Sequence, residues 1–121
     1  MLYSFFDAYP LVYHYRYCLI NGLKQPTTLK GRQFTKLKPT KLLNYPVQAS
    51  AAEGFIDTLC EIISKKPPNY KLVMAIHDSI TLEVPEECNN EAGVFLKSVS
   101  EGTMGTFLSP VPVFTEFKDH V

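Results

Sequence analysis

The strongest constraint on the fold is a pair of strand-like runs with only two residues between them, in KLVMAIHDSITLEV. Residues 71–77 are apolar at nearly every position, as in a strand buried on both faces, and residues 80–84 alternate, as in a strand with one wet face. A connection as short as Asp78-Ser79 makes a tight antiparallel hairpin. The sequence therefore predicts a hairpin with Asp78 at its tip, where a carboxylate faces whatever lies beyond the turn.

Helical periodicity and turn residues predict the rest of an α+β chain with an antiparallel sheet packed by helices. The predicted elements are helices over residues 1–22, 46–66 and 86–105, a basic hairpin over 23–41, the hairpin over 71–84 and a strand over 111–117. Within the longest helix an apolar residue recurs every four positions, and this row is predicted to face the core: Val47, Ala51, Phe55, Leu59 and Ile63.

The net charge is zero, but it is unevenly distributed. Residues 1–45 carry seven basic side chains against Asp7 alone, a net charge of +6, and the basic residues concentrate between Lys24 and Lys41. Such a strip is suited to a polyanion, because basic side chains release counterions when they contact phosphates. A solvated loop explains the charge equally well.

The 121 residues suffice for one domain, and 45% hydrophobic residues is an ordinary folded composition. No stretch approaches the roughly 20 apolar residues that span a bilayer. The N-terminus lacks the pattern of a secretory signal, which predicts a cytoplasmic protein. Three widely spaced cysteines, Cys18, Cys60 and Cys88, favour neither a disulfide framework nor a zinc site.

Two enzyme classes are excluded by the residues around Asp78. His77, Asp78 and Ser79 are the residue types of a hydrolase triad, but adjacent side chains of an extended segment point to opposite faces and do not converge. An HD-type phosphohydrolase needs further metal-binding histidines, and the others here are His14 and His120. The plain alternative is that Asp78 is a turn residue bonded to its own backbone.

The order of these parts resembles the C-terminal region of family A DNA polymerases, the DNA polymerase I type. The resemblance is carried by FFDAYPLV, the LKGR hairpin, NYPVQASAAEGFIDTLCEII and LVMAIHDSITLEVPEE, and it extends over nearly the whole chain. The most specific parts are N-x-P-x-Q followed by small residues and a hairpin with His-Asp at its tip. The resemblance implies a palm-type sheet with a catalytic hairpin.

The resemblance implies that Asp78 is one of two palm aspartates that bind a pair of Mg²⁺ ions. Such ions lower the pKa of the primer 3′-hydroxyl, neutralise the triphosphate of a dNTP and stabilise the in-line transfer. The same analogy places His77 at the primer end. The alternative for His77 is a histidine that packs on the hairpin.

Four further residues match family positions that bind primer-template DNA. Asn44 and Gln48 correspond to residues that reach the minor groove, where amide donors test pairing through the N3 and O2 acceptors that every base pair presents. Helix capping is the competing explanation for Asn44. Arg32 and Lys41 correspond to contacts with backbone phosphates.

Several departures from the family pattern shape the expected function. Most relatives have His-Asp-Glu where this chain has Ser79, and His-Asp-Ser is also typical of single-subunit phage RNA polymerases, although N-x-P-x-Q and LEVPEE favour the DNA enzyme. Thr40 replaces a usual arginine, for which Lys41 is a possible substitute. The family's first catalytic aspartate and its fingers helix lie upstream of the region that this chain resembles.

One aspartate cannot hold two magnesium ions, so the chain alone is expected not to polymerise. The expected partner is a larger polypeptide that carries the fingers, the thumb and the other aspartate. A split enzyme of phage origin, acting in the host cytoplasm, is the simplest explanation, and a truncated intact polymerase is the next. The rival from another class is a non-catalytic nucleic-acid-binding or assembly subunit with a degenerate palm.

Overall fold

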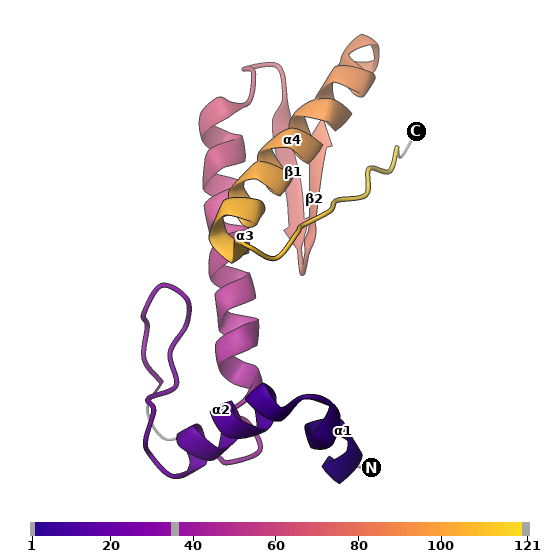
Figure 1. The fold of residues 1–121 in the computed structure, drawn as a ribbon. Coiled ribbons are helices and arrows are strands. Elements are labelled where there is room, and N and C mark those ends of the chain that lie inside the picture. Colours follow the sequence, from indigo (N-terminus) through magenta and orange to yellow (C-terminus); the bar gives the residue numbers. More distant parts are fainter. Residues whose placement is uncertain (1, 35–36, 120–121) are drawn as a thin grey trace. The chain divides into compact units, whose positions relative to one another are not determined.

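A computed structural model describes residues 2–34 and 37–119 of the chain (Figure 1). Its elements, in order, are α1 (Leu2–Ala8), α2 (Pro10–Ile20), α3 (Asn44–Lys65), β1 (Lys71–Ile76), β2 (Ser79–Glu83), the 3₁₀ turn η1 (Glu86–Cys88) and α4 (Asn89–Leu108). The chain divides into two compact units, Met1–Glu53 and Gly54–Val121, with the boundary inside α3. Helices together with an antiparallel sheet confirm the predicted α+β class.

The predicted helix over residues 1–22 is divided in two by proline. α1 ends at Ala8 and α2 begins at Pro10. A proline inside a helix has no N–H to donate to the preceding turn and its ring crowds the carbonyl there, so one continuous helix was a wrong prediction. At the other end, Gly22 has a φ of 67°, the left-handed conformation that glycine adopts after a helix.

The predicted hairpin over residues 23–41 is a turn rather than a pair of regular strands. A single bridge joins Thr27 to Gln33. Between them the Gly31 N–H donates to the Thr28 carbonyl at 2.9 Å, and Gly31 has a φ of 87°. Glycine thus occupies the turn position with a positive φ, and residues 35–36 lie outside the described part of the chain.

Helix α3 buries a different face from the one that its apolar row predicted. The buried residues recur every four positions but start one residue earlier, at Pro46, Ser50, Gly54, Thr58 and Ile62. The predicted row is exposed at Val47 (65%) and Ile63 (54%). The buried hydroxyls of Ser50 and Thr58 are satisfied within the helix, because they donate to the carbonyls of Pro46 and Gly54 at 2.6 and 2.9 Å.

Small residues explain why this face is the buried one. A Cβ added to Gly54 would lie 2.7 Å from Met104 Sδ and 2.8 Å from Phe107 Cδ1, so these two side chains of α4 lie directly against the backbone of α3. In the first unit the Leu29 N–H donates to Ser50 Oγ at 3.0 Å. Both contacts lie on the face of α3 that also carries the buried Ile62, at the small residues Ser50 and Gly54.

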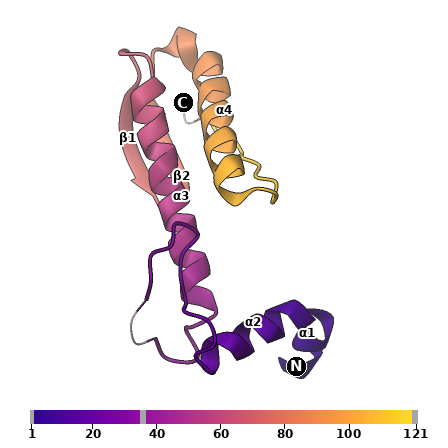
Figure 2. The same ribbon diagram turned by 60° about the vertical axis from the view of Figure 1, so that its left-hand side comes forward.

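In the second unit, the hairpin, the second half of α3 and α4 lie side by side (Figures 1 and 2). Its buried apolar side chains are Ile62, Tyr70 and Ala92, and the Tyr70 ring meets Phe95 edge to face at 6.1 Å. The core of this unit is therefore small for its length.

In the described residues no helix combines the length and the apolarity needed to cross a bilayer.

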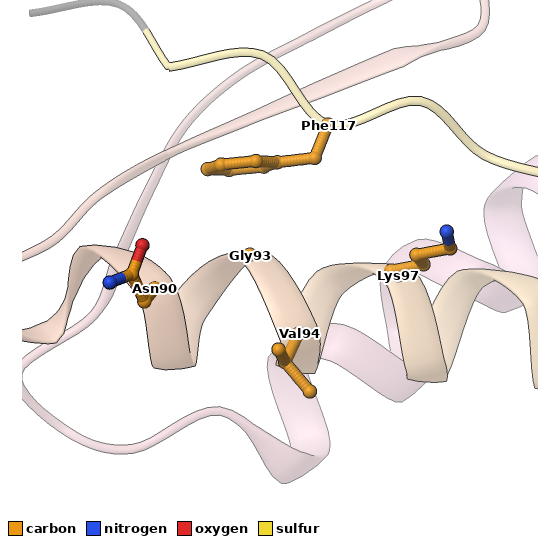
Figure 3. A pocket seen from close by; sticks show the side chains of 5 residues that line it. All are labelled: Asn90, Gly93, Val94, Lys97 and Phe117. Atoms are coloured by element: carbon orange, nitrogen blue, oxygen red, sulfur yellow. The ribbon is translucent and has the colours of Figure 1, made fainter.

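The segment predicted as a strand over residues 111–117 is not part of the sheet. Residues 111–119, here called the C-terminal strap, are held on α4 by side chains. Figure 3 shows Phe117 over Gly93, in a shallow pocket also lined by Asn90, Val94 and Lys97. Two bonds add to this contact: Thr115 N–H to Glu101 Oε1 at 2.8 Å, and Asn89 Nδ2 to Asp119 Oδ2 at 2.6 Å. The prediction of a strand was wrong because these contacts engage the strap with a helix.

The bond from Thr115 makes the strap sensitive to acid. The backbone N–H of Thr115, followed by its hydroxyl and the charge of Lys97, lowers the pKa of Glu101 below its ordinary value of 4.5 despite partial desolvation. Because the pKa of Glu101 is lower when the strap is bound to α4, ionised Glu101 stabilises the bound strap at pH values above the ordinary pKa. This stabilisation is lost as the pH falls through the lowered pKa. We expect the Thr115 amide resonance to be constant near neutral pH and to move toward its unbonded position below pH 4.5. Glu101→Ala should remove this transition, and a transition that persists in this variant would contradict the assignment.

Candidate functional site

The hairpin of β1 and β2 carries the predicted site at its turn. Ile76 pairs with Ser79, so the two-residue loop is His77-Asp78, one residue earlier than predicted. The Ser79 hydroxyl donates to the Ile76 carbonyl at 3.0 Å and closes the turn. The predicted place of Asp78 at the tip is confirmed, and the side chains of both loop residues are exposed.

His77 occupies a backbone position that suits glycine. Its φ is 54°, the one positive value among the described non-glycine residues. A positive φ at the first of two loop positions alone is the type II′ arrangement, which favours glycine there. A residue with a side chain costs about 1–3 kcal/mol in such a conformation, and such outliers cluster at functional sites. The strain motivates a functional role for the imidazole.

Asp78 supplies one ligand of the kind that magnesium prefers. Its carboxylate is exposed and offers the hard oxygen atoms that Mg²⁺ binds. Across the described residues, no three histidine, cysteine, aspartate or glutamate side chains lie close enough together to hold a metal ion. The described side chains therefore do not form a complete metal site among themselves.

The strand that carries this turn is bare. The sequence predicted that β1 is buried on both faces, but Val73, Met74 and Ile76 are 57%, 46% and 48% exposed. The register shifts between Leu72 and Met74, so Val73 has no partner residue on β2. In the described residues the sheet has two strands, and each has one unpaired edge. Exposed aliphatic side chains and unpaired strand edges of this kind are typical of strands that another segment or molecule covers.

Asn44 and Gln48, the predicted minor-groove residues, lie close together on one helix. They occupy the first turns of α3, four residues apart, so they share one face, and both are exposed. They belong to the unit Met1–Glu53, as do Arg32 and Lys41, whereas His77 and Asp78 belong to the unit Gly54–Val121.

The two basic candidates have different surroundings. Arg32 Nε lies 3.3 Å from Glu53 Oε1, and the Glu53 side chain is only 13% exposed. Its other oxygen, Oε2, is buried without a hydrogen-bond partner in the described structure. Lys41 Nζ lies 5.0 Å from the centre of the Tyr45 ring and is exposed. Glu53 could not be predicted from the sequence, because its contact with Arg32 depends on how the turn folds back onto α3.

A comparison of the sequence with protein-family models finds no match, and a search of curated proteins finds none. The resemblance to family A polymerases therefore depends on the quoted motifs.

Proposed function

We propose that this chain is the C-terminal palm portion of a family A DNA-directed DNA polymerase, acting as one of two polypeptides. The observation that carries the proposal is the exposed His77-Asp78 turn, in which a histidine occupies a backbone conformation that suits glycine. Two-metal nucleotidyl transfer needs an accessible carboxylate on a rigid support, and a tight hairpin supplies one.

Asp78 is the proposed metal ligand of the chain, and His77 the contact with the primer end. Bound Mg²⁺ would supply Lewis-acid stabilisation of the transferring phosphate. Asp78 would act as a ligand rather than as a general base. The remaining oxygen ligands come from the partner polypeptide.

Asn44 and Gln48 are the proposed minor-groove contacts, because their shared face presents two amides toward solvent. Lys41 is the better phosphate ligand of the two basic candidates. Arg32 already shares its charge with Glu53, so contact with a phosphate requires it to bind between two anionic groups. Loss of Lys41 should therefore weaken DNA binding more than loss of Arg32.

Bare aliphatic surface supports a protein partner for the second unit. Its exposed aliphatic side chains include Ile56, Ile63, Val73, Met74 and Ile76, each between 46% and 58% exposed. Together they offer both faces of β1 and one side of α3. Surfaces of this kind are typical of permanent interfaces, which resemble a domain core cut in half.

Primer extension by two purified polypeptides tests the proposal. The second polypeptide would be one that carries the family's first catalytic aspartate, in a D-Y/F-S motif, and its fingers helix, with the pattern R-x-x-x-K-x-x-x-Y. We expect extension with magnesium only when both chains are present, because neither holds both aspartates. Extension by the larger polypeptide alone at the same rate would contradict the proposal. It would favour the rival function, a non-catalytic assembly subunit.

A further inference from the structure

The first unit carries an exposed aromatic face that the proposed function does not use. On α2, Tyr9, Tyr13 and Tyr17 recur every four residues, Tyr9 being its N-cap, and Arg16 and Ile20 share their side of the helix. The three tyrosines are 55%, 51% and 50% exposed. These five residues are here called the tyrosine face.

Two rings of this face, those of Tyr9 and Tyr13, contact aromatic rings of α1. Phe5 lies 5.0 Å from Tyr9 and Phe6 lies 5.5 Å from Tyr13, measured between ring centres. The Arg16 guanidinium lies 5.7 Å from the centre of the Phe6 ring. Contacts between aromatic edges and faces fix ring orientation at little entropic cost. Two of the three tyrosine rings are therefore supported by α1, and a cation lies beside them.

The charge of the unit indicates what this face binds. The unit Met1–Glu53 carries seven basic side chains against two acidic ones, a net charge of +5, and one of the two, Glu53, is paired with Arg32. Asp7 is the one acidic residue in the sequences of α1 and α2. A positive unit with half-exposed rings is complementary to a polyanion that carries planar bases.

The ring spacing is compatible with successive bases. Residues four apart on a helix rise by about 6 Å, so each turn of α2 presents one ring to one base of an extended strand. By contrast, the exposed side chains of β1 are aliphatic, with Lys71 as the one cation of that strand, and suit a protein partner. The two exposed surfaces thus differ in the chemistry that covers them.

We infer that the tyrosine face of α2 binds single-stranded DNA by stacking bases on Tyr9, Tyr13 and Tyr17, with Arg16 on the backbone phosphates. The preference for DNA over RNA rests on the proposed function. The stacking itself does not, because it needs neither Asp78 nor a second polypeptide.

Binding of fluorescein-labelled oligothymidylate to the full chain, followed by fluorescence anisotropy, tests the inference. We expect Tyr13→Ala to weaken binding about tenfold and Tyr13→Phe to preserve it, because stacking needs the ring and not the hydroxyl. Arg16→Gln should reduce the slope of log affinity against log salt by about 0.7, the value for one phosphate of a single strand. Leu11→Ala is the matched control, since Leu11 is 83% exposed on another side of α2 and should leave affinity unchanged.

Four outcomes would overturn the inference. Equal binding by Tyr13→Ala and the unaltered chain would exclude stacking, and equal binding of a DNA duplex would show attraction by charge alone. Tighter binding of oligouridylate would refute the choice of DNA. A Tyr13→Ala chain that binds oligothymidylate normally but no longer assembles with the larger polypeptide would identify the face as a protein contact. If the unaltered chain binds oligothymidylate but does not extend primers together with the larger polypeptide, the proposed function is refuted and this inference is not.

Discussion

Replacing Asp78 by alanine is expected to reduce primer extension by the two-chain complex about a thousandfold. A carboxylate that holds a catalytic metal stabilises the transition state by several kcal/mol, and each 1.36 kcal/mol is a factor of ten in rate. The side chain is exposed at a turn closed by Ser79 and Ile76, so its removal leaves the fold intact. Initial rates at saturating magnesium measure the effect, and copurification of the two chains shows that assembly persists.

Glu83→Ala is the matched control for this experiment. Glu83 is the last residue of β2, exposed and at the opposite end of the hairpin from Asp78. It should extend primers at the rate of the unaltered complex. Asp78→Asn, which keeps the size but not the charge, should be as inactive as Asp78→Ala. If both Asp78 variants polymerise normally, the hairpin has no part in catalysis and the chain is an assembly subunit.

The second large effect concerns stability. Ile62→Ala is expected to lower the free energy of unfolding by about 3 kcal/mol, because truncation of a fully buried isoleucine loses transfer energy and leaves a cavity. Ile62 is 0% exposed and is the largest fully buried side chain of the described residues. The core around it is small, so this loss is a large share of the total free energy of unfolding of a chain of this length. Urea unfolding followed by circular dichroism measures the change.

Its neighbour provides the control. Ile63 is identical in chemistry and adjacent on α3 but 54% exposed, so Ile63→Ala should change the free energy of unfolding of the isolated chain by only about 0.5 kcal/mol. If its face is covered by the partner polypeptide, the same variant should instead weaken assembly. Equal destabilisation by the two variants would contradict the assignment of the buried face.

The two isoleucines show how far periodicity predicts burial. The four-residue repeat correctly predicted the helix, but it predicted the wrong side as core, because an apolar row is buried wherever the partner lies. Within this chain the packing partner of α3 approaches the small side, at Gly54. Spacing alone does not distinguish a row that faces the chain's own core from one that faces another molecule.

A similar limit applies to the elements that need a distant partner. The sequence of residues 111–117 is suited to a strand, but a strand needs a neighbour to pair with. In the structure Glu101 and Gly93 engage this segment on α4 instead. The break before Pro10, by contrast, is a local consequence of proline chemistry.

The amino-acid sequence by itself determined the local features of this protein. The helices, the tight hairpin and the place of Asp78 at its tip follow from periodicity, proline and turn length, which act over a few residues. The tertiary structure decided which face of α3 is buried, that Arg32 pairs with Glu53 and that β1 stays bare. These outcomes depend on contacts between segments far apart in the chain, whose free energies no local pattern contains.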